Sequence, residues 1–141
     1  MGSAMARSMG LGIPTGIGAA LAAPNTPIVI ITGDGGMRMY PEIISVAVRE
    51  SLPMLVLLMA DGFLSSVRQS ALKGGLSQKY LRVDSSCWGA TVHAWGCPAE
   101  RIESFADLES ALTHWKQSLG PLLLELPFDA DEYMLMTDGI R

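Results

Sequence analysis

The sequence predicts a three-layer α/β/α fold built around a mostly parallel sheet. Three short apolar runs, at 28–32, 54–60 and 122–126, lack the polar alternation of half-exposed strands, so they indicate strands covered on both faces. Helical patterns lie between them, as crossover connections between parallel strands require. The sequence is 49% hydrophobic and 17% charged, a composition that suits a buried core. Its 141 residues are enough for one such core and too few for two ordinary domains.

The first predicted element is a helix, reached through a glycine-rich segment that spans Gly10 to Ala23. A strand normally precedes the first crossover helix of such a fold, so we expect part of the fold to lie upstream. Pro14 and several glycines interrupt the apolar character of this segment, which argues against a secretory signal. Elsewhere, no purely apolar run approaches the ~20 residues of a spanning helix.

Three further helices are predicted along the chain. They cover Pro41 to Glu50, Asp84 to Trp95, and Phe105 to Leu119. Pro41 suits a first helical turn. Ser104 is the expected N-cap of the last helix, and Gly120 is its expected stop. Residues 127–141 are expected to form an irregular tail.

Charge and cysteine content narrow the class of protein. Ten Lys and Arg against 14 Asp and Glu give a net charge of −4, and the basic residues are scattered, which argues against binding to nucleic acid or an anionic membrane. Cys87 and Cys97 have no second Cys/His pair at metal spacing, so we expect buried thiols in a reducing compartment. The expected location is the cytoplasm.

The segment Gly33-Asp34-Gly35-Gly36 directly follows a predicted strand and opens a helix. Glycines let the backbone approach a ligand closely, and free N–H groups at a helix start attract anions. The pattern nearly matches the dinucleotide fingerprint, except that Arg38 stands where its last glycine belongs. An NAD-binding domain of the Rossmann type is therefore one interpretation.

Asp34 favours another interpretation, because a carboxylate inside a phosphate loop repels the ligand unless a divalent cation lies between them. Asp61 follows the next strand, so both side chains can meet at one edge of the sheet, and Mg²⁺ prefers such oxygen ligands. Gly62 allows a bend that would offer the carbonyl of Phe63 as a third ligand. Taken singly, Asp34 could be a helix cap and Asp61-Gly62 an ordinary turn.

The two acidic segments, in this order and spacing, resemble the thiamine diphosphate motif, which begins Gly-Asp-Gly and ends in Asn-Asn or a variant. The upstream segment from Ser8 to Ala20 also resembles the approach to that motif in acetolactate synthase, benzoylformate decarboxylase and pyruvate oxidase. The resemblance covers nearly the whole chain and corresponds to the C-terminal, diphosphate-binding domain of those longer enzymes. It implies the thiamine-diphosphate-binding fold.

The resemblance also implies roles for individual residues. Mg²⁺ would be held by the side chains of Asp34 and Asp61 and by the carbonyl of Phe63. The loop that contacts the diphosphate would consist of Gly33, Gly35, Gly36 and Met37. Met9 matches the bulky residue that wedges under the cofactor, although simple core packing is the alternative for a methionine. A backbone carbonyl near Arg7 would accept a hydrogen bond from the aminopyrimidine.

The sequence departs from the family pattern at three places. Ala60-Asp61 replaces the usual asparagine pair, which keeps an oxygen ligand and adds a negative charge. Gly36 stands where serine is frequent, and Leu64 where an aromatic residue is common. These departures bear on cofactor affinity.

The family's activating glutamate lies in a separate pyrimidine-side domain, usually of a neighbouring subunit. We therefore expect residues 1–141 to be one domain, either truncated at its N-terminus or one subunit of a split enzyme, and we expect catalytic activity to be a property of the assembled enzyme alone. The implied reaction cleaves or forms a carbon–carbon bond in a 2-oxo acid, as in a lyase or transferase, and a homo-oligomer is expected. A non-catalytic, oligomerising remnant is the other alternative.

The remaining polar and aromatic residues carry weaker signals. The stretch 65–75 borders the substrate in the family, but a solvated surface loop explains it equally well. His93 and His114 are interpreted as structural. The three tryptophans are expected to be core or interface aromatics: Trp88, Trp95 and Trp115.

Overall fold

A computed structural model describes residues 8–83 and 87–137 of the chain. Its centre is a sheet of four strands in the order β1-β2-β4-β3, with every pairing parallel. The strands are β1 (Ile28–Gly33), β2 (Met54–Ala60), β3 (Ala99–Arg101) and β4 (Leu122–Pro127). The predicted parallel sheet and all three predicted strands are therefore confirmed.

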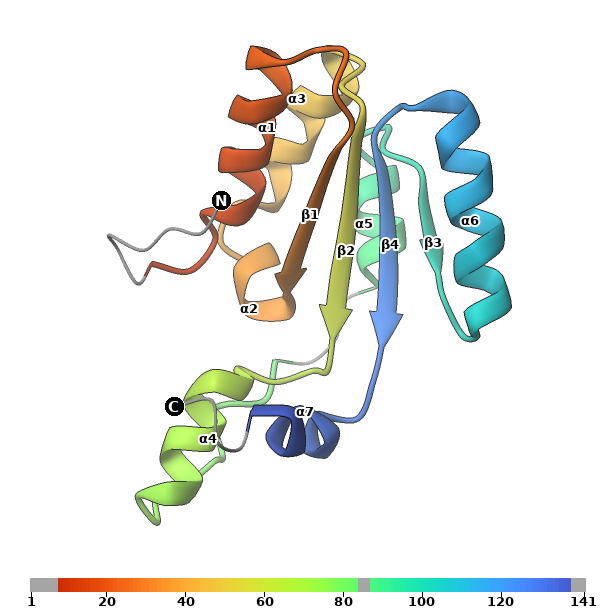
Figure 1. Cartoon of the computed structure of the whole chain (residues 1–141). Coiled ribbons are helices and arrows are strands. Elements are labelled where there is room, and N and C mark those ends of the chain that lie inside the picture. The colour runs from red at the N-terminus through yellow and green to blue at the C-terminus, as the bar shows by residue number, and fades with distance from the viewer. Residues whose placement is uncertain (1–7, 84–86, 138–141) are drawn as a thin grey trace.

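Helices lie on both faces of this sheet and beyond its carboxyl edge (Figure 1). Their bounds are α1 (Gly12–Ala22), α2 (Asp34–Met37), η1 (Pro41–Ile43), α3 (Ile44–Arg49), α4 (Ser65–Lys73), α5 (Trp88–His93), α6 (Phe105–Ser118) and α7 (Ala130–Thr137). In Figure 1, α4 and α7 lie past the arrowheads of β2 and β4, where the parallel strands end. The two helices therefore lie beside the carboxyl edge of the sheet, where the loops after the strands begin.

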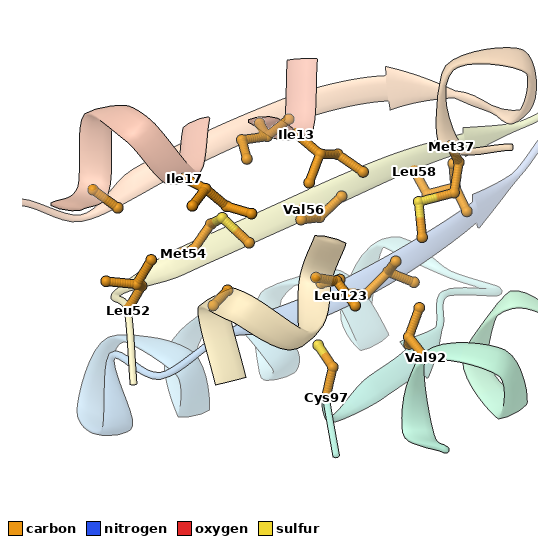
Figure 2. Close-up of a cluster of buried hydrophobic side chains, with 14 of the residues drawn as sticks. Ile13, Ile17, Met37, Leu52, Met54, Val56, Leu58, Val92, Cys97 and Leu123 are labelled. Atoms are coloured by element: carbon orange, nitrogen blue, oxygen red, sulfur yellow. The ribbon is translucent and has the colours of Figure 1, made fainter. Parts of the chain in front are cut away.

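The larger core lies between the sheet and α1, α3 and α5 (Figure 2). Met54, Val56 and Leu58 alternate along β2 toward this side, and all three are fully buried. The intervening Leu55 belongs to a second core, in which Ala111 and Trp115 of α6 pack on the opposite face. Alternate residues of β2 therefore serve different cores, which explains its continuous apolar sequence.

The helix after β3 begins as predicted. The side chain of Ser104 accepts a hydrogen bond from the Asp107 backbone N–H at 3.2 Å, which makes it the N-cap of α6. The helix ends at Ser118, one residue before its predicted end at Leu119, because Leu119 itself adopts the left-handed conformation with φ 49°. Its N–H donates to the Trp115 carbonyl at 2.7 Å.

Several expectations about the elements were wrong or incomplete. The predicted irregular tail contains α7, which follows directly on β4 and begins with Ala130 buried. The predicted helix from Pro41 starts as the 3₁₀ turn η1. Within the predicted helix from Asp84, only α5 is described as helical, and residues 84–86 lie outside the described part.

The short strand β3 was not predicted from the sequence. Among the described residues it pairs with β4 alone, and two of its three residues are charged, so it carries no apolar run. Arg101 is instead in register with Glu125 of β4, and its guanidinium lies 2.7 Å from that buried carboxylate. A cross-strand ion pair thus replaces apolar burial at this edge.

Candidate cofactor and metal site

Asp34 lies at the point where β1 ends and α2 begins, and its side chain is only 2% exposed. The N-cap of α2 is Gly33, so Asp34 is the first residue of the helix and not its cap. Instead its Oδ2 accepts from the backbone N–H of Gly62 at 2.7 Å, and its Oδ1 accepts from the indole Nε1 of Trp88 at 3.1 Å. The capping interpretation is therefore wrong, and Asp34 is tied to the loop that follows the neighbouring strand.

Asp61 holds that neighbouring loop in shape after β2 ends. Its Oδ1 accepts from the Phe63 backbone N–H at 3.0 Å, and the Ser65 hydroxyl donates to its Oδ2. Gly62 between them has φ +73°, a conformation that favours glycine. The loop is thus the turn predicted at Asp61-Gly62. Unlike an ordinary surface turn, it donates the backbone N–H of Gly62 to a buried carboxylate, that of Asp34.

The electrostatics of Asp34 favour a cation nearby. Burial raises the pKa of Asp34, and the negative charge of Asp61 raises it further. The hydrogen bonds from Gly62 and Trp88 and the charge of Arg38 oppose this increase in the pKa. The two carboxylates line the same cavity and their charges repel, and a divalent cation between them would offset the repulsion.

The donor set fits Mg²⁺ better than a metal that needs many protein side chains. Among the residues the structure describes, no group of three or more His, Cys, Asp and Glu could hold a metal. Mg²⁺ is commonly held by one or two carboxylates, with the other positions taken by water and substrate phosphates. Each oxygen of Asp34 and Asp61 accepts a hydrogen bond and keeps further lone-pair capacity.

Both carboxylates line a cavity of about 520 Å³ at the carboxyl edge of the sheet. Six of the predicted site residues contribute to its wall: Met9, Gly33, Asp34, Gly35, Asp61 and Phe63. The rest of the wall is mainly apolar and comes from β1, β2, α4 and the segment that includes α7. The structure therefore brings the two halves of the predicted motif to one cavity.

Gly36 and Met37 lie in the same loop but are not part of the cavity wall. Met37 is fully buried in the larger core, so only its backbone could contact a diphosphate. A Cβ at Gly36 would lie 2.5 Å from Oγ1 of Thr32. Thr32 therefore explains why glycine occupies a position where serine is frequent in the family.

Gly35 allows the loop to approach the residues on the opposite wall. A Cβ at this position would lie 2.7 Å from Cδ2 of Leu64 and 3.5 Å from Sδ of Met9. Met9 itself is 46% exposed and lines the cavity, so simple core packing does not describe it. The carbonyl near Arg7, named from the resemblance, lies outside the described residues.

Sequence reasoning missed the residues that support this site from α4, α5 and α7. Trp88 was interpreted only as a core or interface aromatic, although its indole binds Asp34. Two interpretations of the stretch 65–75 were left open, a segment bordering the substrate and a solvated surface loop. Most of it forms the helix α4, and the hydroxyl of Ser65 donates to Asp61. No local pattern could have linked Trp88 to Asp34, because 54 positions separate them.

Arg68 of α4 contacts the loop after β2, the segment after α4, and α7. Its guanidinium lies 4.6 Å from the centre of the Phe63 ring, Nε donates to Gln78 at 3.0 Å, and Nη2 donates to Asp131 at 2.7 Å. The side chain thereby connects α4 with α7 across the residue whose carbonyl is the predicted third metal ligand. Arg68 thus fixes one wall of the cavity.

The two cysteines are both free and do not contribute to this wall. Cys97 is buried as expected, whereas Cys87 is exposed, which contradicts the expectation of two buried thiols. Cys87 immediately precedes α5, where Trp88 and not Cys87 turns inward. Within the described residues, no helix has the length and apolar character needed to cross a membrane.

The fold and the site together define a class: an α/β domain with a glycine loop and paired carboxylates at the carboxyl edge of a parallel sheet. Residues 1–126 match the family described as "Thiamine pyrophosphate enzyme, C-terminal TPP binding domain". The chain belongs to this family, which confirms the resemblance inferred from the motifs. It is a thiamine pyrophosphate-binding domain like those of acetolactate synthases and related decarboxylases.

Relatives of known name support the same assignment. The chain is 30% identical over 125 residues to the acetolactate synthase isozyme 2 large subunit of Escherichia coli, covering 86% of this chain and 23% of that protein. It is 31% identical over 137 residues to the chloroplastic acetolactate synthase of Arabidopsis thaliana, covering 91% of this chain and 20% of that protein. The chain thus spans less than a quarter of the length of these relatives.

The fold is also found in solved structures. Benzoylformate decarboxylase from Polynucleobacter necessarius superposes with a TM-score of 0.81 at 20% identity, covering 86% of this chain and 24% of that one. The 4-hydroxybenzoylformate decarboxylase of Rhodococcus jostii superposes with a TM-score of 0.79 at 20% identity, covering 86% of this chain and 23% of that one. The predicted thiamine-diphosphate-binding fold is therefore confirmed.

Proposed function

We propose that this chain binds thiamine diphosphate through Mg²⁺ and serves as the diphosphate-side domain of an enzyme that acts on 2-oxo acids. The observation that carries the proposal is the meeting of Asp34 and Asp61 at one cavity, although they follow different strands. This geometry favours a metal-bridged diphosphate over NAD, whose phosphates are bound by the loop without a metal. The motif resemblance and the family membership support the same cofactor.

In this proposal the two carboxylates and the Phe63 carbonyl hold Mg²⁺. The backbone of the loop from Gly33 to Met37 contacts the diphosphate, since N–H groups at the start of a helix favour an anion. Met9, on the opposite wall, supports the rings of the cofactor. Asp34, Asp61 and Met9 line the cavity, which supports roles for their side chains. Met37 is buried in the core, so only its backbone is assigned to the diphosphate.

When bound, the cofactor supplies the carbanion chemistry by which a carbon–carbon bond next to a carbonyl is cleaved or formed. The chain's own contribution is orientation and electrostatics. Asp34 and Asp61 fix the position of the charged end, while the apolar wall that includes Met59 and Leu64 limits access of water. We assign no catalytic acid or base within the chain.

The assembled enzyme needs a pyrimidine-side domain, from this or another polypeptide, to supply the activating glutamate. Residues 1–141 are accordingly one domain of a longer or multi-subunit lyase or transferase. A homo-oligomer is supported by exposed apolar side chains on β1, where Val29 is 54% and Ile31 69% exposed. A cytoplasmic location agrees with the free thiols Cys87 and Cys97.

Sedimentation velocity at micromolar concentration tests the association, with the Val29→Lys variant as a comparison. We expect a sedimentation coefficient above that of a 15.0 kDa monomer, and a smaller one for the variant, since a lysine would place a charge in an apolar interface. A monomer for both proteins would contradict the homo-oligomer. It would leave the cofactor site as a separate question.

Calorimetric titration with thiamine diphosphate tests the proposed function. The titration is made with Mg²⁺, with excess chelator, and with the variants Asp34→Ala and Asp61→Ala. We expect binding that requires Mg²⁺ and is lost in both variants, because each removes one of the two carboxylate ligands. Phe105→Ala is the matched control, since this exposed side chain lies outside the cavity wall.

Two results would contradict the proposal. Binding that survives the chelator would favour a nucleotide-type site that uses the loop alone, and a parallel titration with NAD would identify it. A folded chain that binds no thiamine diphosphate, either alone or mixed with a pyrimidine-side domain of a relative, would indicate the non-catalytic remnant.

A further inference from the structure

Trp88 lies at the first position of α5 and is only 3% exposed. Its indole Nε1 donates to Oδ1 of Asp34 at 3.1 Å, across 54 positions of sequence. A buried indole N–H usually finds some partner. Here the partner is a carboxylate that is itself buried and lines the cofactor cavity.

The two hydrogen bonds of Asp34 act on different oxygens of the same carboxylate. Gly62 donates to Oδ2 from the β2 side, and Trp88 donates to Oδ1 from α5. Together they restrict the rotation of the carboxylate about its terminal torsion, which is otherwise broad. Removing the donor on Oδ1 would leave the Gly62 bond alone and allow the carboxylate to turn.

The indole ring is itself held from a second direction. The Arg38 guanidinium lies 5.8 Å from the centre of the Trp88 ring, within the range of a cation–π contact. Arg38 directly follows α2, the helix that Asp34 opens. The ring is therefore packed against the same loop whose carboxylate it binds.

We propose that Trp88 is a positioning residue that orients Asp34 for the divalent cation and thereby sets the affinity of the site for that cation. The inference rests on the proposed function, since it assigns a cation to Asp34. Partners that hydrogen-bond a metal ligand from behind fix its orientation, and their loss typically lowers metal affinity about 10- to 100-fold. We expect a decrease of that size when the indole N–H of Trp88 is removed.

The chain contains a matched control for this substitution. Trp115 is also buried, with 6% exposure, but its Nε1 donates to the backbone carbonyl of Gly120 at 2.6 Å in the second core. Replacing either tryptophan by phenylalanine keeps an aromatic ring and removes one bonded indole N–H. Only the change at Trp88 affects the candidate metal site.

The test measures Mn²⁺ binding in the presence of thiamine diphosphate, from the loss of the electron paramagnetic resonance signal of free Mn²⁺. The samples are the full chain and the variants Trp88→Phe and Trp115→Phe, each checked for folding by circular dichroism. We expect about 10- to 100-fold weaker Mn²⁺ binding in Trp88→Phe and unchanged binding in Trp115→Phe. Unchanged Mn²⁺ binding in a folded Trp88→Phe variant would overturn this inference and leave the proposed function intact.

A second measurement keeps the inference testable if Trp88→Phe does not fold. The sequence has three tryptophans, so the double variant Trp95→Phe, Trp115→Phe leaves Trp88 as the only indole emitter. We expect Mn²⁺ with thiamine diphosphate to change its emission, and Asp34→Asn to abolish the change. Emission that stays constant while Mn²⁺ binds would overturn the inference, whereas no Mn²⁺ binding in the unmodified chain would first contradict the proposed function.

Discussion

At the scale of single residues, the central feature is the buried carboxylate of Asp34, which accepts two hydrogen bonds. Burial is the largest influence on Asp34 and raises its pKa, so ionisation costs more in the folded chain without metal than for an ordinary aspartate. A bound cation would offset this cost. The same burial that makes the charge costly therefore makes the site selective for a ligand that neutralises it.

The raised pKa predicts how cation binding depends on pH. Mg²⁺ binds the ionised carboxylate, so affinity falls as the pH is lowered through the pKa of Asp34, at a higher pH than for an ordinary aspartate. In Asp61→Asn the negative charge that contributes to the raised pKa is gone, while an oxygen ligand remains. We expect the midpoint of the acid-induced loss of Mn²⁺ binding to move to lower pH in this variant.

Asp129→Asn is the control for that titration, since this exposed carboxylate lies outside the cavity wall. Its midpoint should equal that of the unmodified chain. An equal midpoint for Asp61→Asn would contradict the assigned influence of Asp61 on Asp34.

The two thiols predict a difference in reactivity. Burial raises the pKa of Cys97 to about 11, while Cys87 is exposed. Because the thiolate is the reactive form, Cys97 should react far more slowly with a thiol reagent at about pH 8. We expect one fast equivalent that disappears in Cys87→Ser, and a second only after denaturation; two fast equivalents in the native chain would contradict the burial of Cys97.

Some of the residues at the candidate site could be predicted from the sequence, and others could not. Asp34, Asp61 and the glycines could be found because motif spacing and parallel topology determine where strands end. Trp88 could not be found, since its role depends on how α5 packs against the loop after β1. Met37 is predicted to contact the diphosphate, but its side chain is buried in the core, so only its backbone could do so.

At the scale of elements, α2 packs closely against the end of β1, the strand that it follows. A Cβ at Gly36 would approach Thr32 Oγ1 to 2.5 Å. Gly36→Ser should therefore destabilise the fold by about 1–3 kcal/mol, the usual range for overpacking. Urea denaturation measures this change in the free energy of unfolding.

A double-mutant cycle tests the stated cause of that destabilisation. In a Thr32→Ala background the hydroxyl is absent, so Gly36→Ser should cost less than in the unmodified chain. Gly18→Ser is the comparison, because a Cβ at that position meets nothing within 4 Å. Equal costs with and without the Thr32 hydroxyl would contradict the assigned contact.

Helices and strands whose own sequences are strongly periodic or contain a buried apolar run were predictable. Elements without such a local pattern were not. The strands β1, β2 and β4 and the capped helix α6 all carry local signals. By contrast, β3 depends on an ion pair with β4, and α4 depends on the Asp61 loop at its start. Both are stabilised by tertiary contacts that no short segment contains.

At the scale of the whole molecule, the sheet has one fully covered face and one partly covered face. The core beneath α1, α3 and α5 extends along β1, β2 and β4. The core beneath α6 includes Leu55 and Leu124 but leaves Val29 and Ile31 of β1 exposed. The exposed half adjoins the candidate cofactor cavity, since Ile31 also lines it, so a partner that covers β1 would also approach that cavity.

The central claim is that Asp34 and Asp61 hold a divalent cation that binds the diphosphate. Anomalous diffraction from a crystal of the chain grown with Mn²⁺ and thiamine diphosphate tests this claim most directly. The account predicts one Mn²⁺ peak within coordination distance of a side-chain oxygen of each aspartate and of the Phe63 carbonyl. An ordered diphosphate in the cavity, with no Mn²⁺ peak between the two carboxylates, would contradict it.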